Sequence, residues 1–265
     1  MKRSSLRPTA FVLVATNHGS MLVNRHDYRV DGDNAYGVGY ELLNRSAFSP
    51  DEVDLGIQLL DSRRRHFGDG VVAIDCGANI GTHTIEWAQF MHGWGQVIAI
   101  EAQERIFYAL AGNITLNNCF NAQAMWVAVG RERGTIRVPV PNYFAPSSFG
   151  SLEIRKTERT EFIGQDIDYS EDRMQEVPMI AIDDLALNRL DFLKIDIEGM
   201  EMEALAGARN SIAAWKPILM VEKIKSDEAE LQRFVTALGY QTFQVGLNLL
   251  AVHASDPVAS KIQPT

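Results

Sequence analysis

Residues 71–81 read VVAIDCGANIG, an apolar run that meets an acid and then two glycines. An apolar run without alternation is typical of a parallel strand that is covered on both faces. Gly77 and Gly81 let the backbone turn sharply and approach a ligand closely. The stretch therefore predicts a buried strand that enters a cofactor-binding turn. A helix should then begin at Gly81 and run to about Gly93.

A second apolar run, at 97–101, ends in Glu101 and lies 26 residues beyond Asp75. A carboxylate at this place can accept hydrogen bonds from both ribose hydroxyls of an adenosine. A strand, a glycine turn and a helix also occur in α/β proteins that bind no cofactor. The acids at two successive strand ends favour the cofactor interpretation, because a carboxylate at such an edge needs a donor partner.

The position of Asp75 indicates which kind of ligand the turn would accept. In the pattern G-x-G-x-x-G a pyrophosphate lies over the helix N-terminus. Asp75 precedes the first glycine here, and its carboxylate would repel a phosphate. It would favour a ligand with positive charge, such as the amino group or the sulfonium of S-adenosylmethionine.

The pattern Asp75-x-Gly77-Ala78-Asn79-x-Gly81 is followed by Glu101 and by the run KIDIEGME at 194–201. Together they resemble the FkbM-type family of S-adenosylmethionine-dependent methyltransferases. The resemblance covers about 71–253 in order, and the second motif is the more specific. It implies an α/β, Rossmann-like class I methyltransferase fold with a mostly parallel seven-stranded sheet, helices on both faces and an antiparallel C-terminal hairpin. It also implies methylation of a hydroxyl oxygen, on a sugar, a polyketide or another small metabolite.

The resemblance and the motifs together give a set of expected cofactor-binding residues. The third strand of the sheet is expected at 124–129, and in the family its end borders adenine. The set comprises Asp75, Gly77, Ala78, Asn79, Gly81, Thr84, Glu101, Ala102, Ala128, Val129 and Asp196.

Three acids near strand ends are the candidate catalytic residues. Lys194 and Asp196 share a face of one strand, where pairing is the cheapest way to keep a buried lysine charged. Asp196 and Glu198 flank the carboxyl end of that strand, and Glu222 ends the strand expected at 218–222. Doubly wound sheets bind their ligands at this edge. The alternative for Lys194 and Asp196 is a buried ion pair that takes no part in chemistry. His83, near the start of the first helix, is expected to face solvent or the loop.

Other functions stay open at this point. Asp196, Glu198 and Glu201 offer hard oxygen ligands suited to magnesium, but Glu201 should point away, so no metal ligand is predicted. A nicotinamide-dependent oxidoreductase would need a catalytic Tyr-Lys or His pair, for which the sequence shows no clear spacing. A non-catalytic protein that binds S-adenosylmethionine is the main alternative.

Length and composition predict one large core. The chain has 265 residues, of which 46% are hydrophobic. Residues 1–66 are expected to form an N-terminal extension of hairpin and helix packed on the core. Residues 67–265 are expected to form the S-adenosylmethionine-binding methyltransferase domain. It carries a long polar insertion near 141–176, which would be either a cover for the site or disordered.

Charge and cysteine content narrow the expected partners. A net charge of −9 argues against nucleic acid as a partner. Two cysteines are too few for a disulfide framework, which suits a cytoplasmic location. No apolar run approaches the ~20 residues of a membrane span, so no membrane contact is expected. The expected partner is a small-molecule hydroxyl acceptor, and assembly into a homo-oligomer stays open.

Overall fold

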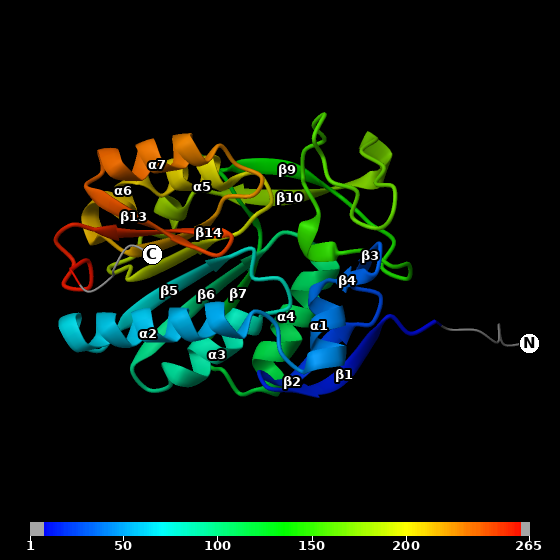
Figure 1. Cartoon of the computed structure of the whole chain (residues 1–265), viewed down its shortest axis with the longest axis horizontal. Helices are drawn as coiled ribbons and strands as arrows, with labels where there is room; N and C mark the ends of the chain where they lie inside the picture. The colour runs from blue at the N-terminus through cyan, green and yellow to red at the C-terminus, as the bar shows by residue number, and fades with distance from the viewer. Residues whose placement is uncertain (1–7, 261–265) are drawn as a thin grey trace, which may run out of the picture.

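A computed structural model describes residues 8–260 of the chain. Its central sheet has seven strands in the order β13-β14-β12-β11-β5-β6-β7. β14 runs antiparallel to both of its neighbours, and the other pairs are parallel (Figure 1). The strands are β5 (Val71–Cys76), β6 (Gly95–Glu101), β7 (Ala122–Trp126), β11 (Phe192–Ile195), β12 (Ile218–Glu222), β13 (Tyr240–Val245) and β14 (Asn248–His253). The predicted fold class is confirmed, including its antiparallel C-terminal hairpin.

Helices cover both faces of this sheet, as the layers in Figure 1 show. Successive residues of a strand point to opposite faces, so Val71 and Ala73 join one core cluster while Val72 and Ile74 join the other. The first cluster includes side chains of α2 (Pro50–Phe67), α3 (Thr82–Phe90) and α4 (Glu104–Leu116). The second includes side chains of α5 (Glu201–Gly207), α6 (Arg209–Trp215) and α7 (Glu228–Ala237). Within residues 8–260 none of the helices combines the length and the apolar character that crossing a bilayer requires.

The N-terminal residues form two hairpins beside the central sheet. β1 (Phe11–Thr16) pairs with β2 (Gly19–Asn24), as the sequence predicts, and this hairpin lies outside the main sheet. The backbone N–H of Leu22 donates to Asn113 Oδ1 at 2.6 Å, which ties the hairpin to α4. β3 (Arg29–Asp31) pairs with β4 (Asn34–Tyr36), and α1 (Val38–Arg45) follows.

A second, three-stranded sheet differs from the sequence prediction. The strand expected at 124–129 is two strands, because β7 ends at Trp126 and β8 (Ala128–Val129) pairs with β10 (Met174–Ile180) instead. β9 (Gly134–Pro139) pairs with the other edge of β10. The polar segment between β9 and β10 holds two short 3-10 helices, η1 (Phe149–Ser151) and η2 (Glu171–Arg173). It therefore connects two adjacent antiparallel strands.

Several predicted helix ends are also wrong. The helix expected from Gly81 to about Gly93 ends at Phe90, and the short helix that the sequence predicts from Asp183 to Leu190 is only the 3-10 helix η3 (Ile182–Leu185). The sequence also predicts one amphipathic helix after Met200, but these residues form two helices, α5 and α6. The sequence predicts Ser226 as the cap of α7, but the cap is Asp227, whose side chain accepts from the N–H of Glu230 at 3.1 Å. The Ser226 hydroxyl bonds to Glu201 instead.

Candidate active site

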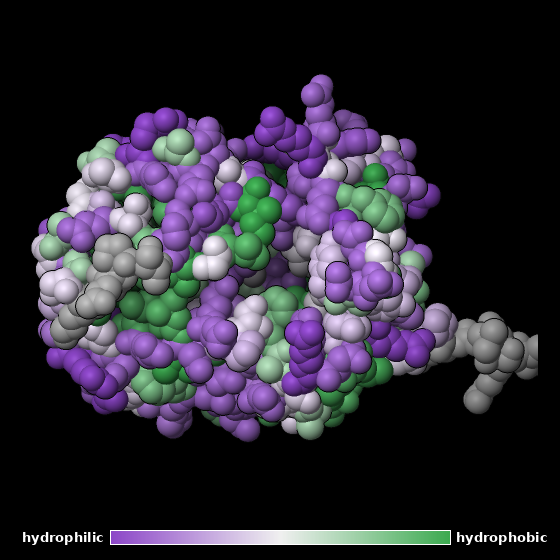
Figure 2. Space-filling view, in the orientation of Figure 1, coloured by the Kyte–Doolittle hydropathy of each residue, from purple (hydrophilic) through white to green (hydrophobic). Residues whose placement is uncertain are grey.

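A cavity of about 910 Å³ lies where β5, β6, β11 and β12 end. Figure 2 shows a hollow near the middle of the molecular face in view, with polar and apolar surface at its rim. The carboxyl ends of the parallel strands form one part of its wall. The N-terminal residues, among them Tyr36, Val38 and Phe48, form another part, and residues 148–154 close a third.

Most of the residues expected at the site line this cavity. They are Gly77, Ala78, Asn79, Glu101, Ala102, Ala128, Val129, Asp196, Glu198 and Glu222. Asp75, Gly81 and Thr84 are not among its lining residues. The sheet edge therefore brings together the loop after β5, the end of β6 and the three candidate catalytic acids.

Asp75 lies behind the cavity wall. The side chain is buried, and Oδ2 accepts a hydrogen bond from Thr84 Oγ1 at 2.7 Å. Oδ1 is buried too and has no hydrogen-bond partner within the described part of the chain. In the sheet, Asp75 lies opposite Lys194 of β11. Its negative charge therefore affects the site by helping to keep Lys194 charged.

Glu101 joins the end of β6 to the loop after β5. Oε2 accepts from the backbone N–H of Asn79 at 3.0 Å, and Oε1 accepts from that of Gln103 at 2.7 Å. Burial raises the pKa of Glu101 to about 7, although the backbone hydrogen bonds lower it. Each carboxylate oxygen can accept a further hydrogen bond. The group is suited to two neighbouring hydroxyl donors.

The structure gives Gly77 a reason to be glycine that does not involve a ligand. A Cβ at this position would lie 1.7 Å from the backbone oxygen of Asp196, and the residue has φ of 79°. The loops after β5 and β11 therefore cross in direct backbone contact. Gly81 is restricted in a similar way, because its Cβ would lie 2.7 Å from Leu110 Cδ1.

The three candidate catalytic acids form a cluster. Carboxylate oxygens of Asp196, Glu198 and Glu222 lie within 4.8 Å of one another. Burial raises the pKa of Glu198 to about 8, although Lys225 lowers it. Burial, together with Asp196 and Glu198, raises the pKa of Glu222 to about 9. A carboxyl with such a pKa accepts a proton only from its ionised fraction, which near neutral pH is smaller for Glu222 than for Glu198.

The loop after β11 holds Glu198 in an uncommon backbone conformation. Its φ is 59°, and Gly199 follows with φ of 96°. Non-glycine residues in this region cost about 1–3 kcal/mol and occur often at functional sites. Glu201 Oε1 fixes the loop by accepting from the N–H groups of Ile197, at 3.2 Å, and Gly199, at 3.0 Å. Because Glu201 turns back on the loop, its carboxylate does not join the acid cluster.

Lys194 is a buried cation beneath this cluster. Nζ lies 2.7 Å from Asp196 Oδ2 and 3.9 Å from Glu52 Oε1, which confirms the predicted Lys194–Asp196 pair. Burial lowers the pKa of Lys194, but Asp196, Asp75 and Glu52 more than offset it and keep the pKa above its usual value. The lysine therefore stays charged.

The prediction for His83 is wrong. The ring is buried in the cavity wall, and Nε2 lies 3.1 Å from Glu52 Oε1. Burial raises the pKa of Glu52, but His83 and Lys194 outweigh it and bring the pKa to about 2. Sequence reasoning places Glu52, which follows Ser49 and Pro50, only in the first turn of an expected helix. It gave no sign that α2 crosses this edge of the sheet.

Asp27, which the sequence did not single out, anchors the segment over the cavity. Oδ1 accepts from the N–H of Phe149 at 3.0 Å, and Oδ2 accepts from that of Gly39 at 3.1 Å. Burial raises the pKa of Asp27 to about 7, although both hydrogen bonds lower it. One carboxylate thus fastens the N-terminal extension to residues 147–149.

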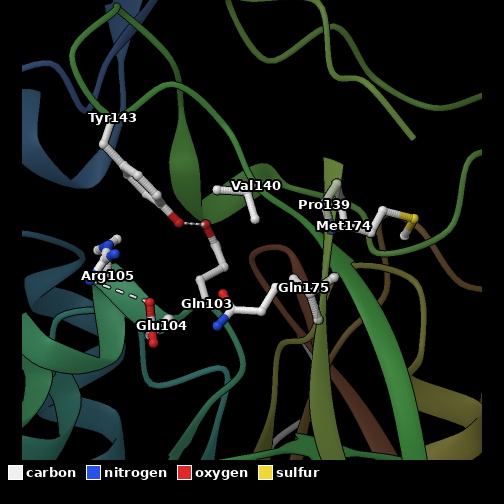
Figure 3. Close-up of a pocket in the computed structure, with 9 residues that line it drawn as sticks. Gln103, Glu104, Arg105, Pro139, Val140, Tyr143, Met174 and Gln175 are labelled. Atoms are coloured by element: carbon white, nitrogen blue, oxygen red, sulfur yellow. Dashed lines mark hydrogen bonds and ion pairs between the residues drawn. The ribbon is translucent and has the colours of Figure 1, made fainter. Parts of the chain in front are cut away.

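A smaller pocket of about 380 Å³ lies next to the main cavity and shares Gln103 and Val138 with it. Figure 3 shows Tyr143 pointing toward Gln103, where the hydroxyl donates to Oε1 at 3.3 Å. Arg105 pairs with Glu104 at its rim. None of the expected site residues lines this pocket.

Comparison with known proteins places the chain in a family. The family described as Methyltransferase FkbM domain matches residues 75–242. The chain belongs to the FkbM methyltransferase family. Methyltransferase 1 of Beauveria bassiana (strain ARSEF 2860) is 26% identical over 154 residues, which are 53% of this chain and 59% of that protein.

Solved structures also resemble this chain, with identities below 25%. The methyltransferase FkbM from Methylobacillus flagellatus KT is 22% identical, with a TM-score of 0.48, and the match covers 70% of this chain and 43% of that one. A precorrin-6y C5,15-methyltransferase from Geobacter metallireducens GS-15 is 12% identical, with a TM-score of 0.42, over 78% and 88% of the two chains. This FkbM family member spans about three fifths of its curated relative and less than half of the Methylobacillus chain.

Proposed function

We propose that this chain transfers a methyl group from S-adenosylmethionine to a hydroxyl oxygen of a small molecule. One observation carries the proposal. The same cavity is lined by the loop that Glu101 holds and by the cluster of Asp196, Glu198 and Glu222. The loop suits the binding of a nucleoside. The acid cluster suits the binding of a cationic group and the removal of a proton.

The residues present fit this cofactor. The cavity volume, about 910 Å³, lies at the upper end of the range for small-molecule sites and leaves room for a small acceptor. Glu101 would accept from the ribose hydroxyls, and Ala102, Ala128 and Val129 would contact the base. The cofactor, when bound, supplies a methyl group on a sulfonium, which a nucleophilic oxygen attacks in line.

Alignment would be the main contribution of the protein. Holding two reactants in attacking geometry can lower a barrier by ~7–11 kcal/mol. A positioned proton acceptor adds about 10²–10⁴-fold in rate. Asp196 already pairs with Lys194, whereas Glu198 and Glu222, with pKa values raised to about 8 and about 9, would accept a proton in their ionised forms, which a cationic cofactor nearby would favour. We therefore assign proton acceptance to Glu198 or Glu222 and a positioning role to Asp196.

The test is methyl transfer from S-adenosylmethionine that carries an isotopic label in the methyl group. The protein is incubated with a panel of sugars, polyketides and other hydroxyl compounds, and products are identified by mass spectrometry and NMR. We expect a labelled methyl ether. Tight cofactor binding without transfer to any compound would support the non-catalytic alternative. Transfer to nitrogen or carbon would overturn the assignment to oxygen.

A further inference from the structure

Lys225 connects the acid cluster to residues 148–161, which form part of the cavity wall and are called the cover below. It follows β12 by three residues, and its side chain is 12% exposed. Nζ lies 2.6 Å from Glu198 Oε2 and donates to the backbone oxygen of Ser151 at 2.9 Å. One ammonium group therefore touches both a candidate proton acceptor and the 3-10 helix η1.

Two acids of the covering segment complete the surroundings of this lysine. Nζ lies 3.5 Å from Glu161 Oε2 and 3.8 Å from Glu153 Oε1. Glu161 also pairs with Arg29 and accepts from the hydroxyl of Tyr36 at 3.4 Å, so the contact extends to the N-terminal hairpin. Lys225 thus lies where the wall, the cover and the N-terminal extension meet.

Resting on the function proposed above, we propose that Lys225 is a positioning residue for the acceptor side of the cavity. Its ammonium group holds the Glu198 carboxylate at the wall and fastens residues 151–161 over it.

The charges around Glu198 explain why one cation matters here. Glu198 is largely buried, the nearby charges of Asp196 and Glu201 favour its neutral form, and Glu222 lies beside it in the acid cluster. Lys225 is the cation that opposes them. Removing it would raise the pKa of Glu198 further and leave Glu153 and Glu161, both in the covering segment, without this shared cation.

The first readout is trypsin cleavage after Lys156 and Arg159, two exposed residues of the cover. Lys225→Met should speed cleavage about tenfold or more, because local opening makes the segment accessible and the lost contacts involve charged groups. Lys225→Arg should restore the wild-type rate. Lys223→Met is the matched control, since Lys223 lies on the same loop and pairs with Glu228 instead.

The second readout is the titration of Glu198, followed by NMR of protein with isotopically labelled glutamate carboxyls. The spectrum of Glu198→Gln identifies the resonance. In Lys225→Met the midpoint should rise by about one pH unit or more, and in Lys225→Arg it should return. A lysine that only supported the fold would not move this midpoint.

Two further measurements keep the outcomes distinct. Calorimetry with S-adenosylhomocysteine should give wild-type affinity, within a few-fold, for each Lys225 variant that folds. A wild-type protein that fails to bind it would refute the proposed function, whereas cleavage and titration would still test Lys225.

If Lys225→Met does not fold, Glu161→Gln should speed cleavage and leave the Glu198 midpoint in place. Unchanged cleavage and an unchanged midpoint in Lys225→Met, or unchanged cleavage in Glu161→Gln, would overturn the proposal.

Discussion

Lys194 Nζ of β11 lies 2.7 Å from Oδ2 of Asp196, the residue that directly follows the strand. The same ammonium group interacts with Asp75 of β5 and Glu52 of α2. A single buried cation therefore holds carboxylates from three elements at the edge where the cavity begins.

Lys194→Met should destabilise the protein by about 3–5 kcal/mol, because it leaves the buried Asp75 and the partly buried Asp196 and Glu52 without their counter-charge. Urea denaturation followed by circular dichroism measures the change in the free energy of unfolding. Lys223→Met removes a lysine from a more exposed pair and should cost no more than about 1 kcal/mol. Equal costs for the two variants would show that Lys194 is not held as described.

Gly77→Ala should destabilise the fold even without cofactor, because the new Cβ would overlap the backbone oxygen of Asp196. Overpacking of this kind costs about 1–3 kcal/mol in addition to the strain of a positive φ. Gly32→Ala is the matched control, since Gly32 has φ of 58° and nothing within 4 Å of its Cβ position. If the two substitutions cost the same, the loops after β5 and β11 do not cross in contact.

The affinity for S-adenosylhomocysteine should depend on the ionisation of Glu101. The pKa of Glu101 is raised by burial to about 7, so part of the population is protonated at neutral pH. Ribose hydroxyls donate to the ionised form, which means that binding lowers this pKa and releases protons. Affinity should therefore rise as the pH increases from about 6 to about 8, by up to tenfold per unit below the pKa. Calorimetry in buffers of different ionisation enthalpy measures the release, and Glu101→Gln should abolish it.

The central fold was predictable because its signals are local. The apolar runs that become β5, β6, β11 and β12 are buried on both faces, and such runs read as parallel strands. β8 was missed because a strand of two residues has no periodicity of its own. Its place in a second sheet depends on pairing with β10, far along the chain.

The site was predictable only in part, for a related reason. Glu101 and the acids at strand ends follow from where parallel strands stop. The contacts of His83 with Glu52, of Asp27 with Phe149 and of Lys225 with Glu198 join distant segments, and no spacing in the sequence reports them. Asp75 carries a clear motif signal, yet its hydrogen bond to Thr84 places it behind the wall.

Substitutions in the acid cluster test the chemistry. Asp196→Asn, Glu198→Gln and Glu222→Gln keep the shape of each side chain and remove its charge. An interaction that develops in the transition state affects turnover more than ground-state binding. We expect kcat to fall by about 10²-fold or more for the residue that accepts the proton, with cofactor affinity changed only a few-fold. If both glutamate variants keep near-normal kcat on an accepted substrate, neither is the proton acceptor.

Calorimetric titration of the wild-type protein and of Glu101→Ala with S-adenosylmethionine tests the central claim most directly. The loop that Glu101 holds is predicted to bind the nucleoside, and each hydrogen bond to a charged acceptor contributes about 1.5–3 kcal/mol. The wild-type protein should bind, and Glu101→Ala should bind more than about tenfold more weakly while its circular dichroism spectrum stays unchanged. No binding to the wild type, or equal affinity for a folded Glu101→Ala, would contradict the account.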